Sequence, residues 1–240
     1  MTAPMTWIDR ISLFSALDYA ALALLVLAWV GIGWKIENPA AHRPSVSVLM
    51  EGFRRDWMRQ MVTREPRVFD AQLVGNLRQG TAFFASATMI AIGGGLALIG
   101  NTEQLAGLAA DLTLNHTPTV VWEIRMLVVL LFLANAFLKF VWAHRLFGYC
   151  SVLMAAVPNK ADEALAYPRA EQAAELSITA ARSFNRAMRS VYFALAALGW
   201  LLGPVPLIVA VLLTVGVLYR REFASHSREI LLRIPPGTQT

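Results

Sequence analysis

Polar side chains close to apolar runs are the first candidates for chemistry in this 240-residue sequence. Polar groups at membrane depth are costly, so they usually face other parts of the protein or a water-filled space. Two interpretations follow: a polar cavity at the inner membrane surface that could hold an anion, or pairing with neighbouring helices, which we prefer. The candidate residues are Asp70, Gln72, Asn76, Arg78, Asn135, Lys139, Arg145 and Arg182.

A second candidate surface lies in a segment of helical periodicity, about 45–62. Its apolar residues recur at helical spacing and form one stripe, with arginines on the other faces. A basic amphipathic helix rich in Trp, Phe and Leu suits the plane of an anionic membrane surface, and docking on another helix of the same protein is the alternative. The candidate lipid or partner contacts are Arg54, Arg55, Trp57 and Arg59.

The sequence gives little support for a catalytic site, a metal site or a cofactor. The four histidines, His42, His116, His144 and His226, lie outside the apolar runs and form no paired-ligand motif. Cys150 is the single cysteine, which excludes an intrachain disulfide. We therefore expect no catalytic residues, no metal and no cofactor.

The carboxylates leave one further alternative, that the protein is an enzyme. It would use Asp70 or Glu222 together with an anionic substrate held by arginines. The acidic residues on the cytoplasmic side each have arginines close by in the sequence, so ion pairs explain them equally simply.

Composition places the chain among integral membrane proteins. Hydrophobic residues make up 57% and charged residues 15%, with a mean hydropathy of +0.52, whereas soluble domains have about 25% charged residues. The net charge of +5 lies mainly on connecting segments, where membrane topology concentrates it. We therefore expect a lipid bilayer as partner and no nucleic acid.

The predicted architecture is an all-α bundle, a single transmembrane domain over 1–240 with the amphipathic helix on its cytoplasmic side. A helix needs about 20 apolar residues to cross the hydrocarbon core of a membrane. The expected membrane segments are about 17–35, 81–100, 120–143, 189–203 and 204–220. In the second segment, Ala87, Ala91 and Gly95 recur at i, i+4 and i+8, a spacing that lets two helices approach closely.

Charge asymmetry predicts the orientation. Asn101–Thr119 contains no Lys or Arg, whereas Lys35–Arg78 carries eight and His144–Arg189 carries six. Because cytoplasmic loops are enriched in positive charge, the N-terminus is predicted to be periplasmic and the C-terminus cytoplasmic. A cleaved signal peptide is the alternative for the first segment, but the sequence has neither its basic start nor its cleavage site.

The last apolar stretch, Val191–Tyr219, allows two topologies. A straight helix of this length would exceed the hydrocarbon core. A hairpin at Gly203-Pro204 returns the arginines that follow Tyr219 to the cytoplasm, whereas one kinked span leaves them outside. We favour the hairpin and five membrane segments, with four spans as the alternative.

Several stretches together resemble a family of bacterial inner-membrane proteins catalogued as domain of unknown function 599. The resemblance covers about 19–230, and its stretches are specific together. They are Arg54–Met58, Asp70–Leu77, Phe83–Ser86, Leu138–Trp142, Phe147–Cys150, Tyr192–Ala196 and Leu218–Phe223, followed by Ser225. It implies a multi-span inner-membrane protein of four or so spans, without an assigned activity.

The preferred function is a non-enzymatic accessory, assembly or scaffold component that contacts other membrane proteins, itself as an oligomer, or anionic lipid. The basic inner face and the small-residue helix surface favour it. A small transporter or channel with an anion-preferring cytoplasmic entrance is the alternative, with Asn135, Lys139, Arg145 and Arg182 lining that entrance.

Overall fold

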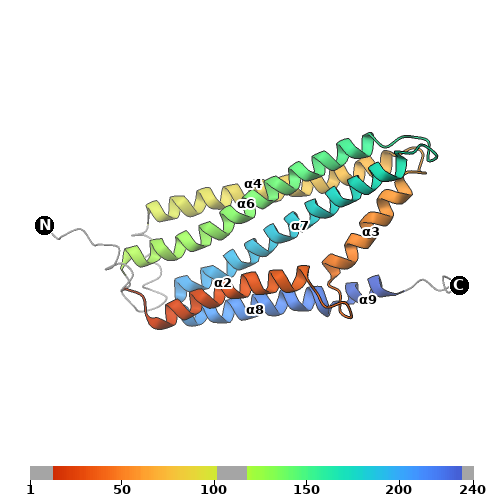
Figure 1. Cartoon of the computed structure of the whole chain (residues 1–240). Helices are drawn as coiled ribbons and strands as arrows, with labels where there is room; N and C mark the ends of the chain where they lie inside the picture. The colour runs from red at the N-terminus through yellow and green to blue at the C-terminus, as the bar shows by residue number, and fades with distance from the viewer. Residues whose placement is uncertain (1–12, 102–117, 234–240) are drawn as a thin grey trace. The chain divides into compact units, whose positions relative to one another are not determined.

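The computed structural model describes residues 13–101 and 118–233, and within them the chain is helical, without strands. The helices follow from long apolar or amphipathic runs of the sequence (Figure 1). In chain order they are α2 (Ala16–Glu37), α3 (Val46–Met61), α4 (Val68–Gly100), α6 (Thr119–Ala155), α7 (Ala166–Leu198), the 3-10 turn η1 (Gly199–Leu202), α8 (Pro204–Phe223) and α9 (His226–Leu232).

The chain divides into two compact units, each built from several segments. Unit 1 comprises Met1–Gly31, Ser86–Phe137 and Ala187–Gly216. Unit 2 comprises Ile32–Ala85, Leu138–Arg186 and Val217–Thr240. The helices α2, α4, α6, α7 and α8 each contribute residues to both units.

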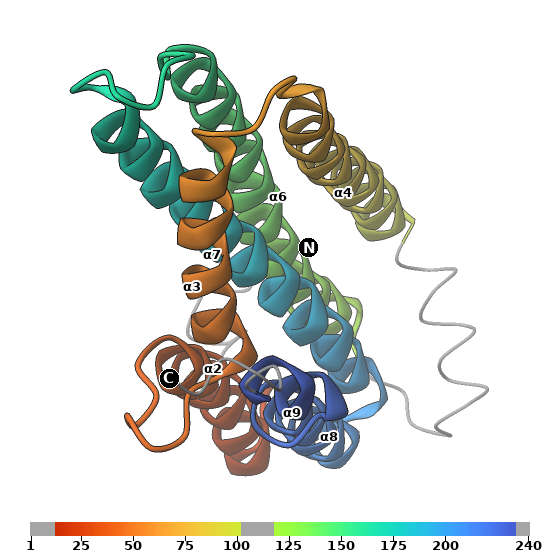
Figure 2. The same cartoon turned by 90° about the vertical axis from the view of Figure 1, so that its right-hand side faces the viewer.

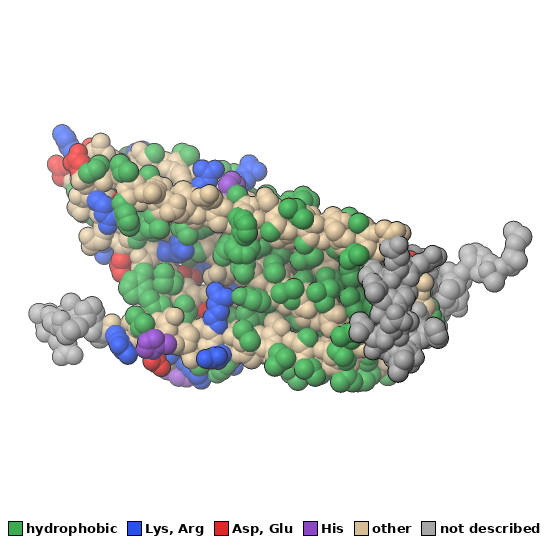
Figure 3. Space-filling model, turned by 180° about the vertical axis from the view of Figure 1, so that it is seen from behind, with side chains coloured by type: hydrophobic (Ala, Val, Ile, Leu, Met, Phe, Trp, Pro, Cys, Tyr) green, Lys and Arg blue, Asp and Glu red, His purple; other side chains and the backbone are tan. Residues whose placement is uncertain are grey.

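Three of the described helices, α2, α4 and α6, are long and apolar enough to cross a membrane. They contain the first three predicted segments. Hydrophobic side chains cover much of the face seen in Figure 3, and Lys and Arg gather on one part of it. These features fit a membrane protein, while the number of crossings and the side of each terminus stay predictions.

Two of these helices are longer than the apolar runs suggested. α4 begins at Val68 and α6 continues to Ala155. At 1.5 Å per residue each is about 50 Å long or more, beyond a hydrocarbon core of about 30 Å. The additional turns belong to unit 2.

The chain reverses between α7 and α8. Gly203 has φ 121°, a conformation that favours glycine, and Pro204 then begins α8. A Cβ at Gly199 would lie 3.0 Å from the carbonyl oxygen of Pro206, so the two sides of the turn approach closely. α7 passes from unit 2 into unit 1, and α8 returns to unit 2 (Figure 1).

A charged cluster lies buried in unit 1. Asp18 Oδ1 accepts hydrogen bonds from Trp200 Nε1 at 2.7 Å and from Arg125 Nη2 at 3.3 Å. The side chains of Asp18 and Arg125 are 8% and 10% exposed. Trp200 is buried within the protein against this cluster.

The predicted small-residue stripe on α4 packs at one of its three positions. A Cβ on Gly95 would lie 2.5 Å from Leu130 Cδ2, so α4 packs closely against this side chain of α6. Ala87 and Ala91 are exposed.

In unit 2 the amphipathic segment forms α3, which lies beside the unit-2 part of α7 (Figure 2). Met58 and Met61 of α3 are fully buried. They share a cluster with Val74 of α4, Met154 of α6 and Ala173 of α7. Of the two interpretations of this helix, docking within the protein is therefore observed, and contact with a membrane surface stays a prediction.

Candidate anion-binding pocket

The amino end of α3 is tied to α2 and α8. The Ser45 hydroxyl donates to the carbonyl of Ile36 at 2.7 Å and accepts from the backbone N–H of Val48 at 3.2 Å. Glu222 of α8 accepts from the backbone N–H of Ser47 at 3.0 Å and from its hydroxyl. Since a helix N-terminus has unsatisfied N–H groups and a positive dipole end, the Glu222 carboxylate is stabilised there.

Beside this junction, unit 2 contains a cavity of about 340 Å³, here called the α3 pocket. Ligand pockets in proteins typically measure about 300–1,000 Å³. α3, α4, α6, α7 and α8 all contribute to its wall. The apolar lining is Val46, Met50, Leu77, Phe147, Ile178 and Phe184, with Gly80 and Ala181 between them. The polar lining is Ser47, Glu51, Arg54, Asn76, Thr81, Arg182, Asn185, Arg221 and Glu222.

One arginine of the pocket is held by a carboxylate. Arg182 donates to both oxygens of Glu51, through Nε at 2.6 Å and Nη2 at 2.7 Å. The Glu51 side chain is 13% exposed. The hydrogen bond to Glu51 raises the pKa of the Arg182 guanidinium, which favours its charged form.

Arg54 differs from Arg182, because its guanidinium has no carboxylate bound to it. Nη1 donates to the hydroxyl of Ser177 at 2.8 Å, and within the described residues Arg54 forms no ion pair. Burial lowers the pKa of Arg54, with Glu51 opposing this from a distance. A partly buried cation with one neutral partner is an electrostatically unsatisfied group that faces the cavity.

The structure brings together three of the predicted site residues. Arg54, Asn76 and Arg182 all line the α3 pocket. Gln72 is exposed on α4. Arg78 lies near Gly148, where a Cβ would come within 3.9 Å of its guanidinium carbon.

Asp70, predicted as part of the polar cavity, is instead fully buried in a separate cluster. Its Oδ1 accepts from Trp57 Nε1 at 2.7 Å and from Arg64. Trp57 is therefore engaged inside the protein, where it packs on the buried methionine cluster of α3. These contacts agree with the structural interpretation of Asp70.

The residues of the predicted transport entrance make separate contacts in the structure. Asn135 Nδ2 donates to Ser190 Oγ at 2.6 Å within unit 1. Arg145 binds the hydroxyl of Tyr149 and stacks over its ring at 5.6 Å. Lys139 is half-buried in α6.

The other candidate contacts of α3 lie on its surface. Arg55 pairs with Glu175 at 2.7 Å, and both side chains are about half exposed. Arg59 is exposed beside a shallow groove that also includes Tyr167 and Glu171.

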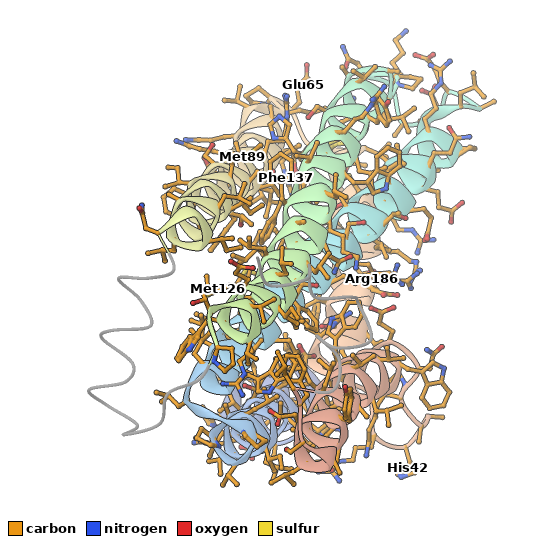
Figure 4. All side chains as sticks on the ribbon, turned by 90° about the vertical axis from the view of Figure 1, so that its left-hand side faces the viewer. His42, Glu65, Met89, Met126, Phe137 and Arg186 are labelled. Atoms are coloured by element: carbon orange, nitrogen blue, oxygen red, sulfur yellow. The ribbon has the colours of Figure 1, made fainter. Side chains whose placement is uncertain are left out.

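Arg186 of α7, labelled in Figure 4, donates through Nε to Glu37 at 2.9 Å. His42 points outward from the connection before α3 (Figure 4) and is exposed.

His144 contacts the carbonyl of Arg78, and His226 contacts Glu229. His116 lies outside the described residues. Across 13–101 and 118–233, no three metal-ligating side chains converge.

Sequence reasoning missed the part of the site that comes from distant segments. Glu222 was a candidate carboxylate, but its partner Ser47 was not. Ser45 and Ser47 at the start of an amphipathic segment are a capping signal that could have indicated an anion-binding helix end. Asn185 and Phe184 carry no local signal of this kind.

Chemically, the arrangement is suited to binding. Guanidinium groups, amides and an apolar wall can hold an anion that has an apolar portion. The described lining contains no His or Cys, and its one hydroxyl–carboxylate contact is that of Ser47 with Glu222 at 3.0 Å.

The long apolar helices are those of a membrane-type protein, and unit 2 contains a cavity lined by both arginines and glutamates. The chain belongs to the family described as "Protein of unknown function, DUF599", whose model matches residues 20–227. No curated protein and no solved structure matches the chain.

Proposed function

We propose that this protein is a multi-pass component of the bacterial inner membrane that works without catalysis. As an accessory, assembly or scaffold protein, it holds an anionic amphiphile in the α3 pocket, and the anionic lipid of the membrane is the abundant source. Arg54 carries this proposal, because its guanidinium lines the cavity with only the Ser177 hydroxyl as partner.

The energetic reason is the cost of burying a charge. An ionised group removed from water is costly unless another charge or several hydrogen bonds compensate it. Arg182 has Glu51, whereas Arg54 has one neutral hydroxyl. An anion in the cavity would supply the missing compensation.

The distribution of charge supports a cytoplasmic location for unit 2. It contains every Lys and Arg of the chain except Arg10, Arg125 and Arg189. By the positive-inside rule this supports a position of the α3 pocket at the inner surface, where anionic headgroups attract basic segments.

A small transporter or channel is the second candidate. Arg182 lines the pocket, as an anion-preferring entrance requires. Asn135 is bonded to Ser190 instead, so a pathway would have to continue from the pocket by other residues.

Purification of the tagged protein in mild detergent, followed by mass spectrometry of eluted lipids and proteins, tests the proposal. We expect an anionic amphiphile at near one per chain. Arg54→Gln should weaken its binding about tenfold, since a hydrogen bond to a charged group contributes about 1.5–3 kcal/mol. Arg233→Gln, which makes the same charge change at the exposed end of α9, is the matched control.

Equal amounts of bound anion in all three proteins would overturn the proposal. A clean homo-oligomer without anion would favour the transporter, which anion flux into vesicles containing the protein would then test. A stoichiometric membrane protein that elutes together with the anion would identify the complex that the component serves.

A further inference from the structure

The apolar runs of α2 and α8 end next to each other in unit 2. The run of α2 ends at Trp34 and is followed by Lys35, and the run of α8 ends at Tyr219 and is followed by Arg220. The ammonium of Lys35 lies 5.1 Å from the centroid of the Tyr219 ring. The two helices, which lie side by side in Figures 1 and 2, therefore change from apolar to basic at the same place.

A second cation reaches the same ring. The guanidinium carbon of Arg43, from the connection between α2 and α3, lies 5.5 Å from the Tyr219 centroid. Arg43 Nη2 also donates to the carbonyl of Phe223 at 3.5 Å, at the carboxyl end of α8, where the helix dipole favours a cation. The group formed by Lys35, Arg43 and Tyr219 is here called the Tyr219 site. It holds two cations from separate segments at one side chain.

The Tyr219 site keeps its positive charge. A carboxylate neutralises the cation that it binds, whereas an aromatic ring attracts a cation through its quadrupole and leaves the charge in place. Among the residues that the structure describes, neither Lys35 nor Arg43 forms an ion pair. Both residues are exposed. An anion can therefore reach two cations here that no carboxylate of the protein neutralises.

The surroundings of the Tyr219 site resemble the boundary between lipid and water. Trp34 is 68% exposed, and both Trp and Tyr are enriched at this boundary. α9 follows α8 and is tied to the connection before α3, because Arg228 Nε donates to the carbonyl of Pro44 at 2.9 Å. Ile230 and Leu232 of α9 are exposed. Exposed apolar side chains next to basic ones suit the headgroup layer of a membrane.

We infer that the Tyr219 site binds the phosphodiester headgroup of an anionic membrane lipid. Lys35 and Arg43 contact the phosphate oxygens, while the acyl chains stay in the bilayer. Each Lys or Arg near an anionic membrane surface adds to the attraction, and a zwitterionic headgroup lacks the net charge that would benefit. The described lining of the α3 pocket does not include Lys35, Arg43 or Tyr219, so this site goes beyond the proposed function.

Native mass spectrometry of the full-length chain in mild detergent tests the site. Wild type and Arg54→Gln are titrated with phosphatidylglycerol or with phosphatidylcholine of the same acyl chains. In the Arg54→Gln background the α3 pocket contributes little, and we expect phosphatidylglycerol to bind at least about tenfold more tightly than phosphatidylcholine. Adding Lys35→Gln and Arg43→Gln to this background should weaken phosphatidylglycerol about tenfold and bring the two lipids to similar affinities.

A matched control removes two charges elsewhere in unit 2. Arg145→Gln together with Lys160→Gln removes a cation 5.6 Å from the Tyr149 ring and an exposed lysine of the connection between α6 and α7. Phosphatidylglycerol binding should change less than about twofold, since salt screens exposed charges that do not touch the lipid. An equal loss in this control and in the Lys35/Arg43 variant would mean that net charge alone attracts the lipid, and would overturn the site.

Substitutions of Tyr219 test whether the ring positions the two cations. Tyr219→Leu keeps both charges and removes the ring, so phosphatidylglycerol should bind about threefold more weakly. Tyr219→Phe keeps the ring and should bind the lipid like the background protein. Melting in detergent checks that each variant is folded. Equal binding by the Leu and Phe variants would overturn the role of the ring.

The remaining outcomes separate this site from the α3 pocket and from a soluble ligand. Phosphatidylglycerol binding that is unchanged without Lys35 and Arg43 would overturn the Tyr219 site and leave the proposed function standing. Loss of all phosphatidylglycerol binding on Arg54→Gln alone would assign the lipid to the α3 pocket and also overturn this site. Displacement of the lipid by an equimolar amount of glycerophosphoglycerol, its headgroup without acyl chains, would indicate a soluble phosphodiester and contradict the lipid assignment.

Discussion

Arg125 of unit 1 and Arg54 of unit 2 are both withdrawn from solvent, yet their surroundings differ. Arg125 lies against the carboxylate of Asp18 and over the ring of Trp200, 5.7 Å from its centroid. Arg54 has a hydroxyl from Ser177 and a cavity. The first arginine is compensated by the fold itself, and the second is not.

The difference separates a buried charge that stabilises the fold from a buried charge that is available to bind a ligand. A buried ion pair whose partners are both present serves packing, and the loss of either partner is costly. A buried cation without a counter-charge stays costly in the folded chain and becomes favourable only when an anion arrives. Variants at both arginines and their partners test this difference.

The largest effect is expected from Asp18→Ala. It would leave Arg125 buried without its carboxylate and the indole N–H of Trp200 without an acceptor. We expect a loss of about 3 kcal/mol or more in the free energy of unfolding, measured by circular dichroism in mild detergent. The double variant with Arg125→Met should recover part of the loss, and unchanged stability of Asp18→Ala would show that the pair is not structural.

A smaller effect is expected from Trp57→Phe, which removes a hydrogen bond to the fully buried Asp70. Because the acceptor is charged, the loss should be about 2 kcal/mol. Reaction of Cys150, which is buried in the same unit, with a maleimide reports the opening of unit 2. Trp34→Phe, at a side chain 68% exposed, is the control and should stay within about 0.5 kcal/mol of wild type.

Arg54→Met should leave the ligand-free protein as stable as wild type or up to about 1 kcal/mol more stable, because an apolar side chain replaces an uncompensated charge. It should also abolish the stabilisation that an added anionic amphiphile gives to wild type. Melting with and without decanesulfonate measures both effects. A strong loss of stability without ligand would make Arg54 structural, like Arg125, and would remove the contrast.

The smallest effect is expected from Arg55→Ala, one position along α3 from Arg54. Its pair with Glu175 is exposed on both sides. Exposed pairs contribute about 0–1 kcal/mol, so we expect a change near the lower end, measured by the same melting experiment. Glu175→Ala should change the stability by the same amount. A loss comparable to that of Asp18→Ala would mean that the exposure of a charge does not determine how much it contributes to stability.

The helices were largely predictable from the sequence, and their ends were less so. Apolar runs located α2, α8 and the centres of α4 and α6. The hydropathy signal ended near Val141 because the adjoining turns are amphipathic, although α6 continues to Ala155. Hydrophobicity marks where a helix is apolar, and it does not mark where the helix ends.

The sequence indicated which residues contribute to the site, but not which of them come together in the fold. Arg54, Asn76 and Arg182 were identified because charged and amide groups near apolar runs are costly to place. Their convergence depends on contacts between distant segments, such as Arg54 with Ser177, 123 positions apart. Asp70 has the same local signal, yet Trp57 and Arg64 enclose it elsewhere in unit 2.

The bond between Ser47 and Glu222 joins residues 175 positions apart. A ribosome makes the amino end of α3 long before it makes the carboxylate that caps it. At about 5–20 residues per second, roughly ten seconds or more separate the two. Throughout that interval the nascent chain carries α3 with an uncapped amino end, and the α3 pocket lacks one wall. The wall of the α3 pocket is therefore complete only after α8 has been synthesised.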